Sequence, residues 1–556
     1  MIETNTIHYI YREKKEMSIR EMALMAMGIL AFAPVTMAVE PEEIPSERLS
    51  CTSIMVGKKA SADGSVMTSH TCDGRYRTWM NWVAASDNKP GATTDICKGL
   101  MRTETAESKD RVEVLGKIPQ VEHTYRFLNT AYPCINEKRL AMGETTIGGR
   151  DTLQNADGLF YIEELQRIAL QRCTSARQAI RLMGDLVREY GYADGGECLT
   201  IADTSEVWIF EVFGEGPKKK GGVWAAQRIP DDEIAVSANI SRIGQIDVKD
   251  TMNFMASDNV FSVARKLKLW DGKEPFSFWR AYSGLNYMGE AKNYSTREFF
   301  IMNTLAPSLH LSADAGELPV SVKPDTLVSV EDVNRLLSSY YEGTEDDYTT
   351  HMMVPDRGKK KAEGEEKPMT VSSLANPWMQ RDERELYAAM GDSTFSKWIR
   401  PVAVAVCAYS TVIQLFSNVP EPVGGVVWMS LDNPAESPRV PIYCGSTKLP
   451  EMFSICGNHT FREDAALWRF RRTNRMATLR WGECRKSLEP ARDYFLAKGV
   501  REIPYVRSIC QEFLKQGKTY EAADYLNGYT SDFFGAELLR WDELYTSYWK
   551  RFWSGF

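Results

Sequence analysis

Short apolar runs separated by turn-forming residues begin at residue 51. Cys51 to Val56 and Val66 to Thr71 are two such runs, and Ser61 to Ser65 between them contains an Asp-Gly pair. An Asp-Gly pair between apolar runs is a strong signal for a β-hairpin. If the turn centres on that pair, antiparallel pairing places Cys51 opposite the stretch from His70 to Tyr76.

From residue 157 the apolar positions follow a helical spacing. One helical stripe contains Leu159, Ile162, Leu165, Ile168 and Ala169. A second helix is predicted over 176–190, with Ser175 as its N-cap and Gly191 as its C-terminal stop. Strand patterns then return at 198–202, 207–212, 223–227 and 234–239. This order predicts an α+β layered fold rather than alternating βαβ units.

The second half of the chain mixes loops, strands and helices. A helix is predicted over 329–341, a polar loop region over 351–377, and strands over 402–415, 426–428 and 441–445. From about residue 464 to the end, the pattern is helical and rich in Arg, Trp and Tyr. We expect this tail to cap the fold or to form the contact of a homo-oligomer.

The first 50 residues are typical of an export leader followed by a propeptide. Arg20 precedes a mostly apolar stretch over 23–35, and residues 36–38 resemble a signal cleavage site. That stretch is shorter than the about 20 apolar residues that a membrane anchor needs. We expect residues 1–38 to be leader and signal peptide, residues 39–50 to be a propeptide, and the mature protein to be periplasmic or extracellular. The alternative is that 39–50 is an ordinary flexible N-terminus and Cys51 lies inside a strand.

The composition narrows the classes of function. Apolar residues make up 43% of the 556 residues, which argues against disorder, and a net charge of −8 gives no reason to expect nucleic acid as a partner. The six histidines form no HExxH motif and no cysteine pair shows CxxC spacing, so we expect no metal and no other cofactor. There is no Gly-rich phosphate loop and no GxSxG motif. Of the eleven cysteines, ten could pair or stay reduced if Cys51 is kept as a free thiol.

Cys51 is the leading candidate for chemistry. A cut between Ser50 and Cys51 would give one residue both a thiol and a free α-amine. The α-amine titrates near pH ~8, so it can act as a base without a histidine. A nucleophile and a general base on the same residue is the arrangement that N-terminal-nucleophile (Ntn) hydrolases use.

Several separate segments, in the same order, carry a family resemblance. They are CTSIMVGKKASADGS from Cys51, INEKRLAMGETT from Ile135, GYADGGECLTIADTSEVWIFEV from Gly191, VWAAQRIPDDEIAVSANISRIGQID from Val223, LLSSYYEGTEDD from Leu336 and PVGGVVW from Pro422. Over most of residues 51–445 the chain resembles the dipeptidase A family of Ntn cysteine peptidases, which is related to penicillin V acylase and bile salt hydrolase.

The resemblance implies a fold, an activity and a domain plan. The implied fold is a four-layer αββα sandwich, with a catalytic domain at 51–450 and a helical C-terminal extension at 451–556. The implied activity is hydrolysis of dipeptides and other small peptide substrates by Cys51, exposed through autoproteolysis or by another protease.

The same resemblance implies roles for individual residues. Asp73 matches the carboxylate that orients the amine and thiol, and Asn239 matches the asparagine that supports the amine and polarises the scissile carbonyl. His70 stands where the superfamily has arginine, which leaves the role of that position open.

His70 and four more residues are candidates for binding substrate. Backbone amides near Glu144 and Thr145 are candidates for the second oxyanion donor, and the Glu144 carboxylate could instead bind the ammonium group of a substrate. Arg297 and Arg400 could lower the thiol pKa, clamp a substrate carboxylate, or serve as structural arginines.

Three other functions fit parts of the sequence. An N-acyl amidase or acylase on the same scaffold would need a long apolar groove, whereas a dipeptidase would need a charged lining. An inactive secreted binding protein would begin near Val39 and not at Cys51. A papain-like protease is disfavoured because its signature around the cysteine is absent.

Overall fold

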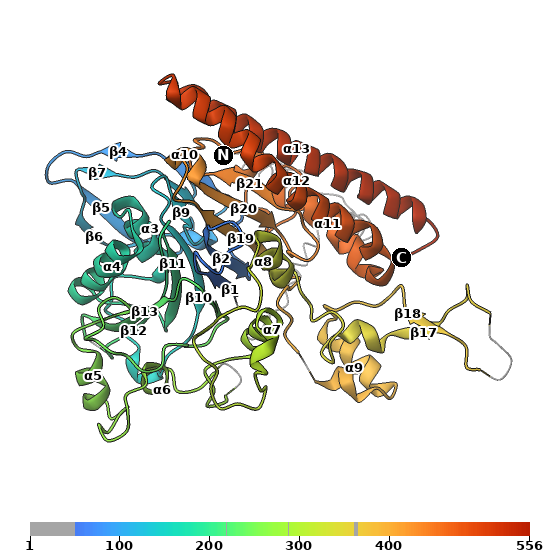
Figure 1. Cartoon of the computed structure of the whole chain (residues 1–556), viewed down its shortest axis with the longest axis horizontal. Helices are drawn as coiled ribbons and strands as arrows, with labels where there is room; N and C mark the ends of the chain where they lie inside the picture. Colours follow the sequence, from blue (N-terminus) through green and yellow to red (C-terminus); the bar gives the residue numbers. More distant parts are fainter. Residues whose placement is uncertain (1–50, 218, 287–288, 361–364, 398) are drawn as a thin grey trace, which may run out of the picture. The chain divides into compact units, whose positions relative to one another are not determined.

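The computed structural model describes residues 51–217, 219–286, 289–360, 365–397 and 399–556. The predicted leader at 1–38 and propeptide at 39–50 lie outside the described residues. The chain combines large antiparallel sheets with helices, so the predicted α+β class is confirmed (Figure 1).

A seven-stranded sheet contains the predicted N-terminal hairpin at its centre. Across the sheet the strands are β16 (Ser321–Val322), β14 (Ile234–Ser237), β1 (Ser53–Val56), β2 (Val66–Asp73), β19 (Cys407–Leu415), β20 (Gly425–Leu431) and β21 (Val440–Tyr443). In the hairpin turn, the Asp63 carboxylate accepts hydrogen bonds from the Ser61 hydroxyl and the Ser65 amide, and Gly64 takes a φ of 73°. Local turn chemistry therefore sets the β1–β2 pairing.

An eight-stranded sheet contains the second run of strands. Across this sheet lie β15 (Phe254–Ala256), β13 (Gly222–Ile229), β12 (Val207–Gly214), β11 (Glu197–Ala202), β10 (Ala141–Thr146), β9 (Ile135–Asn136), β8 (Phe127–Asn129) and β3 (Asn81–Val83). Short two-stranded sheets pair β4 (Ser86–Asp87) with β7 (His123–Thr124), β5 (Thr93–Lys98) with β6 (Glu113–Pro119), and β17 (Met353–Pro355) with β18 (Met369–Val371).

The two large sheets contact each other at their centres. The Thr68 hydroxyl on β2 lies 2.6 Å from the Thr200 hydroxyl on β11, and the Thr145 hydroxyl on β10 lies 2.6 Å from the Ser237 hydroxyl on β14. Gly143 permits the close approach, because a Cβ there would lie 2.2 Å from the Ser69 carbonyl oxygen. These contacts bring β10 close to β1, which follows Cys51, and to β14, which precedes Asn239.

Helices pack against both sheets. Helices α3 (Ile162–Arg172) and α4 (Ala176–Tyr190) contact the eight-stranded sheet, and α4 begins and ends as predicted, with the Ser175 hydroxyl accepting the amide hydrogen bond of Gln178. Helices α7 (Thr296–Leu305) and α8 (Val330–Leu337) contact the seven-stranded sheet. The other short helices are α5 (Val260–Lys266), α6 (Phe278–Tyr282), α9 (Arg381–Ala389) and α10 (Glu421–Gly424).

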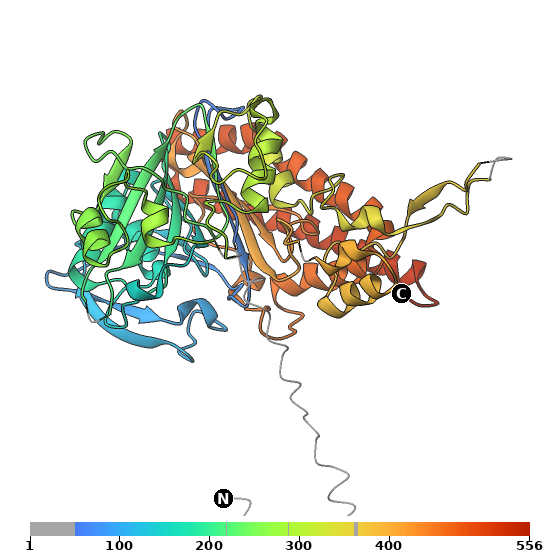
Figure 2. The ribbon, with the colours of Figure 1, turned by 90° about the horizontal axis from the view of Figure 1, so that it is seen from below.

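The C-terminal region forms three helices, as the pattern predicts. They are α11 (Ala466–Leu479), α12 (Trp481–Lys515) and α13 (Thr519–Arg551). Helix α13 runs along β21, where the Thr530 hydroxyl donates a 2.9 Å hydrogen bond to the Pro441 carbonyl (Figures 1 and 2). Within the described residues, no helix is both long and apolar enough to cross a bilayer.

Tertiary contacts shorten two of the predicted strands. The strand predicted over 234–239 ends at Ser237, and Asn239 adopts a left-handed φ of 66°. The strand predicted over 402–415 begins only at Cys407, because the Val402 carbonyl bonds to the Arg400 guanidinium and the Val406 carbonyl bonds to the Gly74 amide. All eleven cysteines lie in the described part of the chain and carry free thiols.

Candidate active site

Cys51 lies buried just ahead of β1, at the place that the hairpin predicts. The Thr52 amide donates a 2.8 Å hydrogen bond to the Thr71 hydroxyl, and the Thr71 amide donates a 2.9 Å bond to the Thr52 carbonyl. This pairing brings the Cys51 thiol to the end of β2. Burial raises the pKa of the thiol well above its usual range; Glu144 and Cys72 raise it further, whereas a hydrogen bond from the Asp73 backbone lowers it. The thiol therefore needs a base close by before it can act as a nucleophile.

Arg297, at the start of α7, joins Cys51 to Asn239. One guanidinium nitrogen donates to the Cys51 carbonyl at 2.6 Å and to the Thr52 hydroxyl at 2.9 Å. The other donates to the Ala238 carbonyl at 2.9 Å and to Asn239 Oδ1 at 3.0 Å. The buried Arg297 guanidinium thus fixes the position of Cys51 relative to the segment that follows β14.

Asn239 is held in a fixed orientation. With its Oδ1 occupied by Arg297, its Nδ2 donates a 2.8 Å hydrogen bond to the Thr146 carbonyl. The capping box of α7 adds a further tie, because Glu298 accepts a 2.9 Å bond from the Ala238 amide. The side chain amide is therefore pre-organised beside the end of β10.

Asp73 pairs with the second predicted arginine. Arg400 Nη2 lies 2.6 Å from Asp73 Oδ2, and both side chains are buried. The same carboxylate oxygen accepts a 2.9 Å hydrogen bond from the Thr71 hydroxyl, which in turn receives the Thr52 amide. Arg400, Asp73 and Thr71 thus form a buried chain of charge-assisted hydrogen bonds that ends at the residue after Cys51.

His70 and Glu144 complete a cluster with Cys51. His70 Nε2 lies 3.3 Å from Glu144 Oε2, and ligand atoms of Cys51, His70 and Glu144 all lie within 4.8 Å of one another. Among the described residues, neither His70 Nε2 nor Glu144 Oε2 has a hydrogen-bond partner. The cluster can therefore exchange protons or receive a polar ligand.

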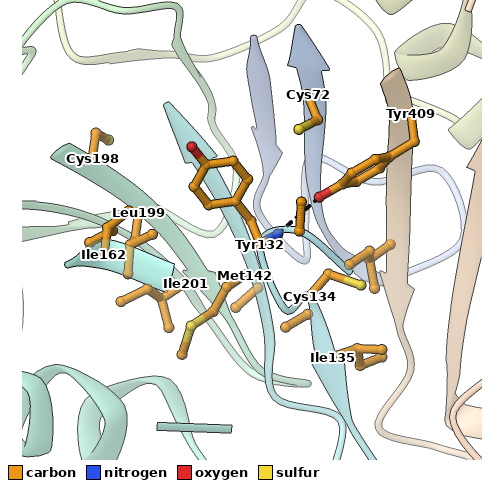
Figure 3. Close-up of a cluster of buried hydrophobic side chains, with 14 of the residues drawn as sticks. Cys72, Tyr132, Cys134, Ile135, Met142, Ile162, Cys198, Leu199, Ile201 and Tyr409 are labelled. Atoms are coloured by element: carbon orange, nitrogen blue, oxygen red, sulfur yellow. Dashed lines mark hydrogen bonds between the residues drawn. The ribbon is translucent and has the colours of Figure 1, made fainter. Parts of the chain in front are cut away.

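Aromatic residues that the sequence did not single out surround this cluster. The rings of Tyr132 and Tyr409 meet His70 edge-on, with ring centroids 5.5 and 5.8 Å away. Figure 3 shows Tyr132 and Tyr409 near Cys72, with the Tyr409 hydroxyl accepting a 3.1 Å hydrogen bond from the Tyr132 amide. Burial raises the pKa of Tyr76, and the Cys51 and Cys72 thiols raise it further. Tyr76 and Tyr132 therefore add neutral hydroxyl groups to the environment of the thiol.

Further buried carboxyl groups lie in the surroundings of Glu144. Burial, then Glu144 and Asp194, raises the pKa of Glu197, and burial, then Asp194, raises the pKa of Glu163. In the described part of the chain, Glu163 Oε2 and Glu197 Oε2 lack a hydrogen-bond partner. A cation that entered this region would gain several charge-assisted contacts. The sequence missed Glu163, Asp194 and Glu197; their position on the Gly191–Val212 motif and the first turn of α3 was the available signal.

Glu211 supports the segment that follows Asn239 and predicts a pH effect. Its carboxylate accepts hydrogen bonds from the Ser241 hydroxyl and the Arg242 amide, and burial raises its pKa to about 7. Between pH 4.5 and 7 the folded protein keeps this proton and the unfolded chain loses it. Glu211 alone should therefore lower the free energy of unfolding by about 3 kcal/mol as pH rises through that window.

Urea unfolding midpoints at several pH values measure that dependence. Glu211→Gln, which cannot titrate, should flatten the decline, whereas the exposed control Glu113→Gln should leave it unchanged. An equal slope in Glu211→Gln and the unaltered protein would assign the effect to other groups.

Comparison with known proteins gives the family of this site. The sequence profile of Peptidase family C69 matches residues 50–493, from just ahead of Cys51 into α12. The chain belongs to peptidase family C69. The predicted family resemblance is thereby confirmed, and this C69 peptidase can be compared with curated relatives.

Those relatives are similar over most of their own length. A "Probable dipeptidase" of Latilactobacillus sakei is 26% identical over 446 residues, which cover 76% of this chain and 81% of the relative. A "Probable dipeptidase" of Salmonella dublin is 25% identical, with coverage of 71% and 81%. "Dipeptidase A" of Lactobacillus helveticus is 24% identical, with coverage of 73% and 77%.

Proposed function

We propose that this C69 peptidase is an exported dipeptidase that uses Cys51 as its N-terminal nucleophile after removal of residues 39–50. The single observation that carries the proposal is the attachment of Cys51, through Arg297, to Asn239 beside the buried Glu144. The names of the curated relatives support dipeptides as substrates. Two antiparallel sheets in contact, with helices packed on each, support the four-layer αββα Ntn-hydrolase fold.

In the proposed reaction the α-amine of Cys51 accepts the thiol proton. The thiolate attacks the peptide carbonyl of the substrate, and the Asn239 amide with a backbone N–H near Glu144 and Thr145 stabilises the tetrahedral oxyanion. The protonated amine then gives its proton to the departing amine of the second residue. Water, activated by the same α-amine, attacks the thioester and releases the first amino acid. Asp73 and Arg297 hold the nucleophile in position and do not bond to substrate.

A second base is available on this geometry. Ligand atoms of His70 and Cys51 lie within 4.8 Å of each other, and His70 is flanked by Glu144. After a small approach of the ring, the imidazole could take the thiol proton even in a chain that is not cut before Cys51. The two schemes share the nucleophile and differ in the group that accepts its proton.

The carboxyl groups around Cys51 favour a substrate with a free ammonium group. In a dipeptide the ammonium lies one carbon from the carbonyl that is attacked, so its partner must lie beside the thiol, as Glu144 does. Glu197, next to Glu144, supplies a second carboxyl. This lining of carboxyl groups supports a dipeptidase rather than an N-acyl amidase.

Glu144→Gln should lower kcat/KM for dipeptides by about 10- to 100-fold, the cost of losing one charge-assisted hydrogen bond. The unaltered enzyme should discriminate against N-acetylated dipeptides by a similar factor, and Glu144→Gln should reduce that discrimination. Glu421→Gln, which removes a surface carboxylate paired with Lys138, is the control and should have no effect. Equal hydrolysis of free and acetylated dipeptides would exclude this assignment.

The direct test of the whole proposal measures N-terminal processing and dipeptidase activity on the same sample. N-terminal sequencing of the purified mature protein should give Cys-Thr-Ser-Ile, and the same sample should cleave a panel of dipeptides. A fully active sample that begins upstream of Cys51 would overturn the N-terminal-nucleophile scheme and leave the His70 scheme.

A further inference from the structure

A second cluster of thiol, imidazole and carboxylate lies outside the residues that serve Cys51. Ligand atoms of Glu104, Cys456 and His459 all lie within 4.8 Å of one another. His459 Nδ1 is 2.7 Å from Glu104 Oε1 and 3.9 Å from Cys456 Sγ. Nothing in the proposed reaction uses these three residues.

The hydrogen bond on the far side of the imidazole fixes which nitrogen can face an ion. His459 Nε2 lies 3.2 Å from the Arg75 carbonyl oxygen, which can only accept a hydrogen bond, so Nε2 carries a proton. Nδ1 faces Glu104 and Cys456, and an ion that binds there displaces the proton that Nδ1 shares with the Glu104 carboxylate. A histidine that donates one ring N–H to a backbone carbonyl while the other nitrogen binds metal is the usual arrangement in metalloproteins.

Backbone and hydroxyl contacts hold the three donors together. The Cys456 amide donates to the Glu104 carbonyl at 3.1 Å, and the Gly457 amide donates to the Thr78 hydroxyl at 2.9 Å. Cys456 is buried and the His459 side chain is 13% exposed, whereas the Glu104 side chain is 45% exposed. The thiol and the imidazole therefore lie on the buried side of the site, whereas the carboxylate side is open to solvent, from which an ion can enter.

The donor set and its spacing suit a zinc ion. Zinc binds thiolate, imidazole and carboxylate in a tetrahedral arrangement whose bond lengths separate neighbouring donors by about 3.4–3.6 Å. The 2.7 and 3.9 Å separations reach those values with shifts of well under about 1 Å at flexible side-chain ends. Three protein donors leave the fourth position to water.

We propose that Glu104, Cys456 and His459 bind one zinc-class divalent ion, which ties the loop after Ser454 to the segment that contains Glu104. The same loop holds the segment that follows Asp73, because Asn458 Nδ2 donates to the Gly74 carbonyl at 2.7 Å and to the Tyr76 carbonyl at 3.0 Å. An ion here stiffens the backbone that carries Tyr76 toward the Cys51 thiol. The proposal is independent of the proposed peptidase mechanism.

Cobalt titration of the purified mature protein tests the site. Co²⁺ should bind with a thiolate charge-transfer band in the near ultraviolet, and Zn²⁺ should displace it. Cys456→Ser should lose the band, and His459→Gln and Glu104→Gln should weaken binding by more than the about 10- to 100-fold that an outer-shell partner is worth. Cys97→Ser, at a partly buried cysteine that belongs to neither thiol cluster, is the matched control and should keep the band.

A second measurement guards against misfolded variants. Zn²⁺ should raise the thermal midpoint of the unaltered protein and of Cys97→Ser but not of Cys456→Ser. Glu104→Gln, at the most exposed of the three donors, keeps the surrounding packing and should show reduced affinity with an unchanged far-ultraviolet spectrum.

Two outcomes would overturn the proposal. One is a charge-transfer band of full strength in Cys456→Ser. The other is loss of the band in Cys51→Ala alone, which would place the ion at Cys51, His70 and Glu144 instead.

Discussion

Cys51→Ser is expected to lower kcat/KM for a dipeptide by at least about 10⁴-fold, as loss of a catalytic nucleophile does in other hydrolases. The hydroxyl group fits the buried site, so the hydrogen bonds from Arg297 to the Cys51 carbonyl and to Thr52 should persist. The serine hydroxyl, however, is much harder to deprotonate than a thiol, and the nearby Glu144 carboxylate opposes a new negative charge.

Steady-state kinetics on protein with a verified N-terminus measure this effect. Cys97→Ser is the control for general thiol loss and should retain full activity. If the cut before Cys51 is autoproteolytic, Cys51→Ser should also accumulate as an uncut precursor, which intact mass would show. Activity of Cys51→Ser within tenfold of the unaltered enzyme would remove Cys51 from the reaction.

The second large effect separates the two candidate bases. A mature chain extended by one alanine ahead of Cys51 keeps the thiol but moves the α-amine away from it. If that amine is the base, kcat/KM should fall by about 10²- to 10⁴-fold, the usual worth of a general base. His70→Gln, with the native N-terminus, should then lose less than tenfold.

The reverse pair of results would identify His70 as the base. In that case the extended chain stays active and His70→Gln loses the larger factor. Since both proteins keep Cys51, Asn239 and Arg297, the comparison isolates the proton acceptor. A pH profile supports the assignment, because kcat/KM should rise with pH until the α-amine is neutral, near pH ~8.

Local signals account for what the sequence predicted well. The Asp-Gly turn at 63–64 sets the hairpin, and Ser175 and Gly191 bound α4, because turn and capping chemistry depends on a few neighbouring residues. The family resemblance likewise rests on short contiguous segments, such as the one that begins at Cys51. The strand end at Ser237 was missed because tertiary contacts from Arg297 and Glu298, and not local propensity, pull residues 238–239 out of the sheet.

Long-range contacts account for what the sequence could not predict. Arg297 reaches Cys51 across 246 positions, and His459 reaches Glu104 across 355. Arg297 and Arg400 were candidates by residue type, yet nothing local shows that their partners are the Cys51 carbonyl and Asp73. The Glu104 cluster was missed for the same reason, since motif spacing describes only ligands that are close in sequence.

The contact between α13 and β21 has a consequence for how the chain avoids self-association. β21 is the last strand of its sheet, and an uncovered last strand invites pairing with another copy. Pro441 removes one backbone donor there, and the Thr530 hydroxyl occupies its carbonyl. A fragment ending near residue 450 would lose that cover, so the helical tail also protects the catalytic region from edge-to-edge aggregation.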